Sequence, residues 1–377
     1  MIYLDHAATT PLRREVLEAM WPHFGPDFGN PSSHHEVGES ARRALEQARA
    51  DVAQQLGARA SEITFTSGGT EADNAALKGI ALAAPRGKHV VISSIEHPAV
   101  LESAEFLGRL GYEITVLDVD HDGMVHPEVL EAALRDETTL VSIQHANNEV
   151  GTIQQVETLS RLAAGRGAPF HTDAVQAAGW LDLDVDRLGV QAVSISGHKL
   201  GAPKGIGVLY VRRGTRFEPL IHGGGQESGR RSGTENVAAA VGMAAALRLA
   251  GDGGAGNDEV VVRRDAFIER VLAEVPSAEL TGDRNHRLPG SASFVFPGTN
   301  GETILLELEA RGIVCSSGSA CAAGSDEPSH VLTAMGYDAA VAQTAVRFTF
   351  GRTTTSEELD AAATELVRAV AAVSALG

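Results

Sequence analysis

Short apolar runs alternate with helical patterns between residues 63 and 211, and this alternation constrains the fold more than any other feature of the sequence. Each run has the length and apolar content of a buried strand, and most are separated by a stretch with helical spacing. The alternation predicts an α/β fold, with a mostly parallel sheet of seven strands flanked by helices. The predicted strands are residues 63–66, 89–93, 113–117, 140–145, 169–173, 192–195 and 208–211.

A second, smaller α/β domain is predicted after the glycine-rich stretch 251–258. The chain has 377 residues, which is too long for one ordinary core. We therefore expect a large domain of residues 15–250 and a small domain of residues 251–377, which is joined by the N-terminal arm, residues 1–14. The small domain should hold strands near 291–296 and 345–350, helices near 259–275 and 301–311, and a terminal helix from Ser356 to about Ser374 with the capping-box pattern S-E-E-L at its start.

Polar residues follow five of the predicted strands at their carboxyl ends. In a parallel α/β sheet these ends lie along one edge, and ligands bind there. We therefore expect the five clusters to meet in a single site, since a purely structural role explains them poorly. The clusters are T-S-G-G-T-E (66–71), E-H-P (96–98), N-N-E-V-G (147–151), T-D-A-V-Q (172–176) and S-G-H-K (196–199).

Lys199 stands just after the predicted strand 192–195, in the turn S-G-H-K. A lysine in a partly desolvated pocket has a lowered pKa and can attack a carbonyl to form a Schiff base. This is how enzymes anchor pyridoxal phosphate (PLP). The turn by itself fits a solvated surface lysine equally well, so the choice depends on the neighbouring clusters.

Three of the neighbouring clusters contain residues that PLP requires. Backbone amides and hydroxyls of residues 66–70, at the start of a predicted helix, make an anion site that suits a phosphate. Asp173 could keep a pyridine nitrogen protonated, which strengthens the cofactor as an electron sink. His97 could stack on a planar ring and move protons. Helix capping explains Thr70 or Asp173 taken singly, and a lone histidine such as His97 is more often structural.

The two cysteines, Cys315 and Cys321, are expected to be thiols, because the chain has no export signal. Cys321 lies in the small-residue stretch 316–325, where a thiol is accessible, whereas Cys315 follows an apolar run and fits a core position. Two thiols cannot build a four-cysteine zinc site. A metal at His171 is disfavoured since no ligand cluster supports it, so no metal is predicted.

Arg347 lies on an apolar strand, in V-R-F-T-F. Burying an arginine is costly unless it is paired. A substrate carboxylate could pair with it in a bidentate manner, and an internal salt bridge would explain it equally well. The loops H-G-G-G-Q-E (222–227) and R-R-S-G-T (230–234) are rich in glycine and could bind phosphate or cross a subunit boundary.

The net charge of −18 argues against a nucleic-acid-binding surface as the main function. The N-terminal residues lack the basic region and apolar core of a signal peptide. The longest apolar helical run, residues 237–247, is too short to span a bilayer. We therefore expect a cytoplasmic protein with no membrane contact and no direct nucleic-acid binding.

Taken together, the motifs are highly specific, and over nearly its whole length the chain resembles the NifS-like (group I) cysteine desulfurases. These belong to the class V aminotransferase group of fold-type I PLP enzymes. The resemblance rests on Y-L-D-H-A-A-T-T-P, G-N-P-S-S, T-S-G-G-T-E-A-D-N, E-H-P-A-V, N-N-E-V-G, T-D-A-V-Q, S-G-H-K, H-G-G-G-Q-E, R-S-G-T and S-S-G-S-A-C. The last motif marks the subgroup with an extended cysteine loop.

The resemblance implies PLP as the cofactor, L-cysteine as the substrate, and a role for each matching residue. Lys199 would bind the cofactor covalently, Asp173 would pair with the ring nitrogen, and Gln176 with the ring hydroxyl. His97 would stack on the ring and act in acid–base steps, and Cys321 would take the sulfur as a persulfide while alanine leaves. Phosphate contacts would come from Gly69, Thr70, Ser196 and His198, with Thr234 from the other subunit of a homodimer, and substrate carboxylate contacts from Asn148 and Arg347.

The sequence leaves the sulfur acceptor open among an iron–sulfur scaffold, a tRNA-thiolation enzyme and a DNA-sulfur-modification system. A selenocysteine lyase or a PLP aminotransferase of the same group is the nearest alternative, and Cys321 argues against transamination, which does not need it. The intact set of Lys199, Asp173, His97 and Cys321 argues against a catalytically silent scaffold or sulfur-relay protein. One departure is Ala322-Ala323, where many relatives have serine or threonine after the loop cysteine.

Overall fold

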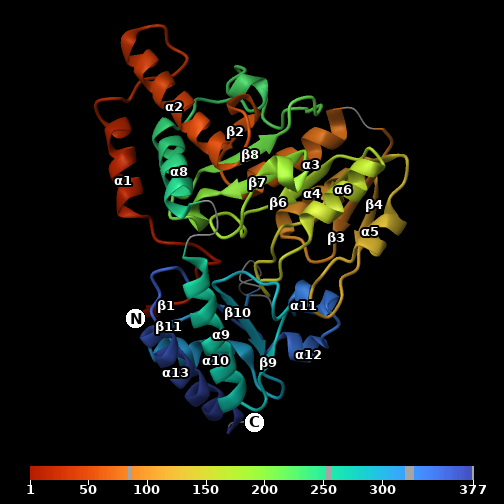
Figure 1. Cartoon of the computed structure of the whole chain (residues 1–377), viewed down its shortest axis with the longest axis vertical. Helices are drawn as coiled ribbons and strands as arrows, with labels where there is room; N and C mark the ends of the chain where they lie inside the picture. The colour runs from red at the N-terminus through yellow and green to blue at the C-terminus, as the bar shows by residue number, and fades with distance from the viewer. Residues whose placement is uncertain (84–85, 252–255, 319–326, 376–377) are drawn as a thin grey trace.

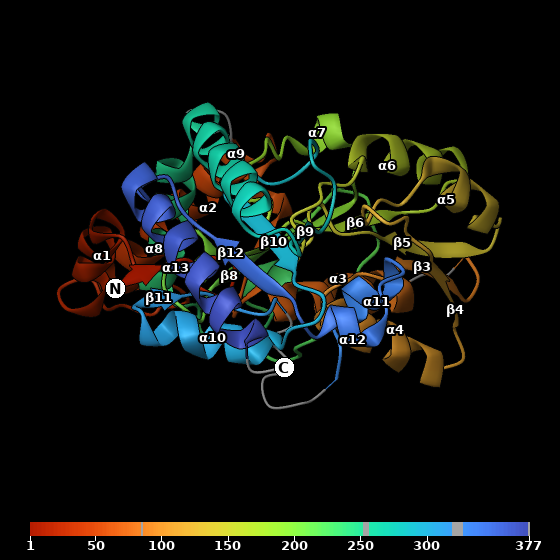
Figure 2. The same cartoon turned by 90° about the horizontal axis from the view of Figure 1, so that it is seen from below.

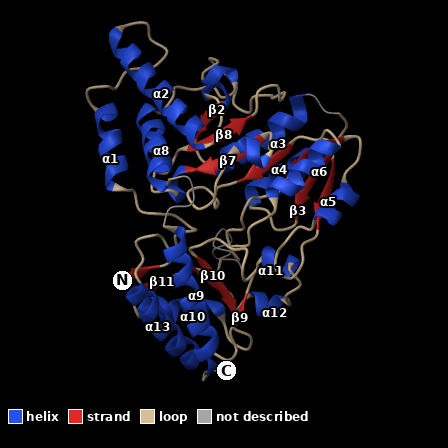
Figure 3. Ribbon diagram, in the orientation of Figure 1, coloured by secondary structure: helices blue, strands red, loops and turns tan. Residues whose placement is uncertain are grey.

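The chain folds into two α/β parts, which lie one above the other in Figure 1 with both termini in the lower part. The computed structural model describes residues 1–83, 86–251, 256–318 and 327–375. The upper part is built around a seven-stranded sheet and the lower part around a three-stranded sheet. Figure 3 shows the strands lying among helices in both parts. No helix in the described ranges has both the length and the apolarity needed to cross a membrane.

The seven-stranded sheet confirms the predicted α/β class and the mostly parallel arrangement. Its order is β2-β8-β7-β6-β5-β3-β4, and β8 runs antiparallel to both of its neighbours while the other pairs are parallel. The carboxyl ends of β3, β5, β6 and β7 therefore lie along one edge. The strands are β2 (Ile63–Thr66), β3 (His89–Ser93), β4 (Glu113–Leu117), β5 (Thr138–Ser142), β6 (Phe170–Asp173), β7 (Ala192–Ser196) and β8 (Gly207–Val211).

Strand β5 is shifted towards the N-terminus from its predicted position, residues 140–145. It begins at Thr138 because this residue pairs with His89 of β3, and its hydroxyl also lies 2.9 Å from the His89 ring. It ends earlier than predicted because the following residues turn to other partners. The Gln144 N–H, for example, donates to the Glu96 carboxyl at 2.9 Å.

Eight α-helices of the described chain accompany this sheet. Helix α3 packs against β7 and β8, and α8 packs against α1 and α2. The helices are α1 (Arg14–Met20), α2 (Glu36–Gln55), α3 (Gly69–Ala83), α4 (Pro98–Arg109), α5 (Pro127–Ala133), α6 (Val156–Gly165), α7 (Val185–Leu188) and α8 (Val237–Ala250), with short 3-10 turns η1 (Trp21–Phe24), η2 (Ala60–Glu62), η3 (Gly197–Lys199) and η4 (Glu227–Gly229).

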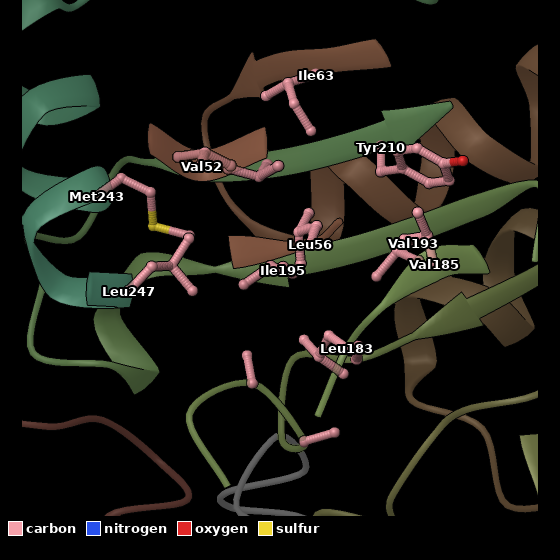
Figure 4. Close-up of a cluster of buried hydrophobic side chains, with 14 of the residues drawn as sticks. Val52, Leu56, Ile63, Leu183, Val185, Val193, Ile195, Tyr210, Met243 and Leu247 are labelled. Atoms are coloured by element: carbon pink, nitrogen blue, oxygen red, sulfur yellow. The ribbon is translucent and has the colours of Figure 1, made fainter. Parts of the chain in front are cut away.

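Figure 4 shows the part of the core where α2 and α8 meet the sheet. Val52 of α2, Leu56 at its end, Ile195 of β7, and Met243 and Leu247 of α8 are all buried in one cluster. Burying a side chain of this size stabilises the fold by about 1.5–3 kcal/mol. The packing fixes β7 in place, and β7 leads directly into the turn that carries the predicted lysine.

The lower part has an antiparallel sheet of order β12-β10-β9. Phe267, Phe294 and Phe348 form an aromatic cluster on it, with ring centroids 5.2–6.4 Å apart. Figure 2 shows α9, α10 and α13 beside β10 and β12, seen from below. The elements are β9 (Glu279–Leu280), β10 (Ser291–Val295) and β12 (Val346–Thr349), with α9 (Asn257–Glu274), α10 (Gly301–Ala310), α11 (His330–Ala334), α12 (Ala339–Ala342) and α13 (Ser356–Ser374).

The capping box of α13 lies one residue earlier than predicted. Thr355 keeps an extended backbone, with φ −88° and ψ 163°, and is therefore the N-cap in place of Ser356. Its hydroxyl accepts from the Glu358 N–H at 3.2 Å, and its own N–H donates to the Glu358 carboxylate at 2.9 Å. The reciprocal pair satisfies two N–H groups at the helix start.

The N-terminal arm, residues 1–14, contacts both parts. Its strand β1 (Ile2–Tyr3) pairs in parallel with β11 (Ile313–Val314), and Leu4 is fully buried in the lower core. Further along, the Thr10 hydroxyl donates to the His198 carbonyl oxygen at 2.7 Å in the upper part. We propose the domain division expected from the sequence, 15–250 against 1–14 with 251–377, because Leu4 packs with the lower core.

Candidate active site

The residues predicted to bind PLP gather at the carboxyl edge of the seven-stranded sheet. Asp173 ends β6 and Ser196 ends the hydrogen-bonded neighbour β7. Lys199 follows directly in the turn η3. His97 is the N-cap of α4, just beyond β3, and Gly69 begins α3, just beyond β2. Four strand ends and two helix starts therefore supply one site.

A cavity of about 470 Å³ opens at this edge, between the upper and lower parts. Lys199, Gln176 and Asn148 line it from the upper part, Ala7 from the arm, and Arg352 from the lower part. Its volume lies within the range of cofactor and small-molecule sites. Because both parts line the cavity, a change in their relative position would change its shape.

The arm lies directly against the lysine turn. The Lys199 Nζ donates to the backbone oxygen of Ala7 and, at 2.9 Å, to that of Ala8. The Gln176 side-chain amide donates to the same Ala7 oxygen at 3.1 Å. The motif H-A-A-T-T near the N-terminus thus holds the lysine amine at the cavity wall.

Asp173 is buried, and its surroundings act on its charge in two directions. Burial raises the pKa of its carboxyl, whereas His97, Lys199 and the Val175 N–H, which donates at 2.9 Å, all favour the ionised form and act against this rise. A cationic ring nitrogen opposite this carboxylate would give the buried charge a partner. The site therefore fits the role predicted for Asp173.

His97 combines a structural contact with a reactive ring. The Ala99 N–H donates to its Nδ1 at 3.1 Å, so the structural role considered from the sequence is present, as a helix cap. Burial lowers the pKa of the ring, which makes His97 neutral at neutral pH with its hydrogen on Nε2. The cap fixes the orientation of a ring that can stack and exchange a proton.

The first turn of α3 forms a cradle that a larger residue would fill. A Cβ at Gly69 would lie 2.7 Å from the Val175 side chain and 3.3 Å from that of Ser196. The helix N–H groups, with the Thr70 and Ser196 hydroxyls, are donors of the kind that bind anions. Burial lowers the pKa of His198 to about 4, so that ring is neutral. This donor set fits the phosphate of PLP.

Arg347 and Asn148, which were predicted to bind a substrate carboxylate, lie together, and Arg347 is already paired. Its Nη2 lies 2.7 Å from Asp5 Oδ1, and its Nη1 donates to the Asn148 backbone oxygen at 2.8 Å. The internal salt bridge left open by the sequence is therefore present. The Arg347 Nε is buried and has no hydrogen-bond partner among the described residues. Carboxylate binding stays a prediction.

Thr234 does not line the cavity that holds Lys199. Thr234 is exposed and lines a separate cavity of about 130 Å³ with Ser67 and Arg231. Cys321 lies outside the described residues. Cys315 is partly buried, and burial raises the pKa of its thiol to about 12, which makes it a poor nucleophile at neutral pH.

Sequence analysis missed a set of buried acids around the site. Asp73 of α3 and Glu96 before α4 are almost completely buried. Glu149 is also buried and accepts a hydrogen bond from the Ser329 hydroxyl at 2.6 Å. The available signal was their position inside the motifs T-S-G-G-T-E-A-D-N, E-H-P and N-N-E-V-G, beside residues of the predicted site.

Replacing Glu96 by glutamine is expected to remove a pH dependence of stability. Burial raises the pKa of Glu96 to about 8, although Ser93 and the Gln144 N–H favour the ionised form. Between its unfolded pKa near 4.5 and about 8, the native state holds a proton that the unfolded state releases. The wild-type free energy of unfolding should therefore fall by about 4 kcal/mol across this window relative to the Glu96→Gln variant.

Urea unfolding at pH 5 and pH 8 checks this prediction. The matched control is Glu102→Gln, an exposed glutamate on α4, whose stability should follow that of the wild type at both pH values. If the difference in the free energy of unfolding between the wild type and Glu96→Gln is the same at pH 5 and at pH 8, Glu96 does not hold this proton.

Known proteins with this fold and donor set are PLP enzymes. Residues 2–362 match the family described as Aminotransferase class-V. A cysteine desulfurase IscS from Dictyoglomus turgidum is 50% identical, with 95% of this chain and 92% of that protein covered. Another from Methanosarcina thermophila is 47% identical, with 95% and 89% covered. A solved structure of a NifS-like protein has a TM-score of 0.91 at 37% identity, with 97% and 98% covered.

The fold, the lysine turn and the anion cradle define a class V aminotransferase, a class of PLP-dependent enzymes. Within this class, the chain belongs to the NifS/IscS-like cysteine desulfurase family. The predicted family and cofactor are therefore confirmed, and PLP is the cofactor that the cradle and Asp173 fit.

Proposed function

We propose that the chain takes sulfur from L-cysteine, releases L-alanine and holds the sulfur as a persulfide on Cys321. The observation that carries this proposal is the convergence of Lys199, Asp173 and His97 on one sheet edge, where the charge of Lys199 acts on Asp173. The cavity beside them has room for a small amino acid. The related cysteine desulfurases support the choice of substrate.

PLP, when bound, supplies an electron-withdrawing ring that makes the α-proton of an amino acid acidic. The protein residues would supply the rest. Lys199 would hold the cofactor and then move the α-proton, since its Nζ is kept at the cavity wall by the Ala7 and Ala8 oxygens. Asp173 would stay ionised opposite the ring nitrogen. His97 would act through its Nε2–H, because Nδ1 is occupied by the Ala99 N–H.

The sulfur-transfer step would belong to Cys321. Its thiolate Sγ forms a bond to the substrate sulfur, the carbon–sulfur bond of the substrate breaks, and the electron pair of that bond goes to the carbon side. A proton then completes the methyl group of alanine. The nucleophile must be the thiolate, and the His97 Nε2–H would be a suitable hydrogen-bond donor to it, since Nδ1 accepts from the Ala99 N–H.

The test is product analysis with L-cysteine as the substrate. The purified, PLP-loaded chain should release alanine and, in the presence of a thiol reductant, an equal amount of sulfide. Formation of a keto acid with no sulfide would instead indicate transamination and would contradict the proposal.

A homodimer is proposed as the working form, with Thr234 of one subunit reaching the phosphate site of the other. Its support is an exposed apolar surface, formed by Trp21, Phe24 and Phe28, that water does not favour. Thr234 itself lies outside the cavity that holds Lys199. A second copy would cover the apolar surface and could complete the phosphate site.

Replacing both Trp21 and Phe28 by glutamate is expected to convert the dimer into monomers. These side chains are 71% and 72% exposed, and a buried aromatic anchor typically contributes about 2 kcal/mol or more to an interface. Light scattering should report half of the wild-type mass. Val262→Glu is the matched control, since Val262 is 68% exposed on α9 and should leave the mass unchanged. A double variant that keeps the wild-type mass would place the interface elsewhere.

The acceptor of the persulfide sulfur is proposed to be a protein in the cytoplasm, either an iron–sulfur scaffold or a thiolation enzyme. The family supports transfer of this kind. Mass spectrometry of proteins that gain sulfur from the loaded enzyme in a cell extract would identify the acceptor. Transfer that requires no protein acceptor would contradict the proposal.

A further inference from the structure

Asp73 is a buried carboxyl for which the proposed reaction has no use. It lies on α3, and only 1% of the residue is exposed. Its hydrogen bond is to Ser194, and Oδ1 has no hydrogen-bond partner among the described residues. The His171 Nε2 is 3.7 Å from Oδ1, but this ring is neutral, since burial lowers the pKa of His171 to about 3. Asp73 therefore has poor surroundings for a negative charge.

Asp173 lies near Asp73 and has much better partners. Burial raises the pKa of Asp73, and the charges of Asp173 and Glu96 raise it further, against the hydrogen bond from Ser194. Asp173 itself accepts a backbone N–H and interacts with the charge of Lys199. Two buried carboxyls that interact this strongly do not both ionise. The negative charge therefore lies on Asp173, whose partners stabilise it better.

A chain of hydrogen bonds leads from Asp73 across three neighbouring strands. The Ser194 hydroxyl on β7 lies 2.9 Å from His171 Nε2 on β6. The Ser142 hydroxyl on β5 lies 2.8 Å from Nδ1 of the same ring. Ser142, His171 and Ser194 are all 0% exposed. Asp73 is thus connected to a fully buried polar row beside Asp173.

We propose that Asp73 carries a proton and, through Ser194, His171 and Ser142, acts as a neutral positioning residue that leaves Asp173 as the single negative charge opposite the cofactor ring. The inference rests on the proposed role of Asp173. The Asp73 hydroxyl donates to Ser194, and Ser194 donates to His171 Nε2. The His171 Nδ1–H then donates to Ser142.

Counting donors and acceptors supports this direction of the chain. A neutral imidazole has one donor and one acceptor nitrogen, and the chain uses both. It leaves the Ser142 hydroxyl hydrogen without an acceptor among the described residues, and Asp73 Oδ1 without a donor, as it also is in the reverse direction. The reverse direction satisfies Ser142 but leaves Asp73 as a carboxylate with one hydrogen bond and a bare oxygen near Asp173. Burying such a charge costs more than one unsatisfied neutral hydroxyl.

Infrared spectroscopy of the full-length enzyme tests where the proton is. A protonated carboxyl has a carbonyl band separate from the carboxylate bands, and this band shifts in deuterium oxide. At pH 7 we expect one such band to be lost in Asp73→Asn and kept in Asn74→Ala, the neighbouring polar residue on α3. Measurement in a Glu96→Gln background removes the acid band expected from Glu96.

The cofactor then reports on the positioning role. Asparagine keeps a neutral hydrogen-bonding group, so Asp73→Asn should keep the wild-type PLP affinity within about twofold and the pH midpoint of the cofactor absorbance. Asp73→Ala cuts the chain and should weaken PLP binding about tenfold. If Asp73→Ala does not fold, the infrared band and the pH midpoint of Asp73→Asn still show whether Asp73 carries a proton.

Two results would overturn the inference. One is the absence of an acid band that depends on Asp73. The other is a shift of about one pH unit in the Asp73→Asn midpoint, since removing a neighbouring charge changes the pKa of the titrating group. Failure of the proposed function is distinguishable, because the infrared test also works without PLP, whereas Lys199→Ala tests cofactor anchoring.

Discussion

Replacing Lys199 by alanine is expected to abolish alanine and sulfide release, with a loss of at least about a thousandfold in turnover. Among the described residues that line the main cavity, Lys199 is the one lysine, and the arginines there cannot act as neutral amines. The variant should also fail to bind PLP covalently. Borohydride reduction followed by mass spectrometry should add the cofactor mass to the wild type and nothing to the variant.

Lys204→Ala is the matched control for this variant. Lys204 lies five residues further on, in the same glycine-rich turn, and its side chain is exposed. It should be trapped with PLP and turn over like the wild type. Covalent cofactor in Lys199→Ala, or its loss in Lys204→Ala, would mean that the anchoring residue has been assigned incorrectly.

The lysine could be located from the sequence because its position depends on local patterns. Apolar runs gave β3 and β4 with their correct ends and β7 to within one residue. Parallel strands end along one edge, so Lys199, Asp173 and His97 had to approach one another once the sheet was recognised. The role of the glycines in T-S-G-G-T could also be predicted from the local sequence, since Gly69 permits the close approach to Ser196.

The contacts that the sequence could not give join residues far apart in the chain. Asp5 pairs with Arg347 across 342 positions, and Ala7 accepts from Lys199 across 192. Such pairs depend on how the arm crosses between the two parts, and the spacing of apolar residues in the sequence does not predict that path. The chain of hydrogen bonds from Asp73 to Ser142 could not be predicted for a similar reason, because its residues become neighbours only once the order of the strands in the sheet is known.

Polar residues also concealed element boundaries. Strand β5 begins at Thr138, whose hydroxyl bonds to His89, and a search for apolar runs passes over such a start. The capping box of α13 depends on the extended backbone of Thr355. Both features result from hydrogen bonds made in the folded chain and not from hydrophobic spacing.

Replacing Cys321 by alanine is expected to lower sulfide release at least about a thousandfold while PLP stays covalently bound. The reasoning is chemical, because a persulfide requires a second sulfur and the chain has only two cysteines. The other one, Cys315, has a thiol whose pKa burial raises to about 12, so little thiolate is available at neutral pH. Borohydride trapping and sulfide release, measured on the same sample, separate cofactor anchoring from sulfur transfer.

Cys315→Ala is the control that makes this prediction specific. It removes a thiol of the same type and should leave sulfide release near the wild-type level. Since Lys199 and Asp173 remain in the Cys321→Ala variant, L-cysteine should still change its cofactor absorbance although sulfur transfer stops. Full sulfide release by Cys321→Ala would exclude the persulfide role, and its loss in Cys315→Ala alone would assign the nucleophile to Cys315. If Cys321→Ala instead gave no absorbance change with L-cysteine, Cys321 would be needed for substrate binding as well, and the division between a lysine-centred site and a separate sulfur acceptor would be wrong.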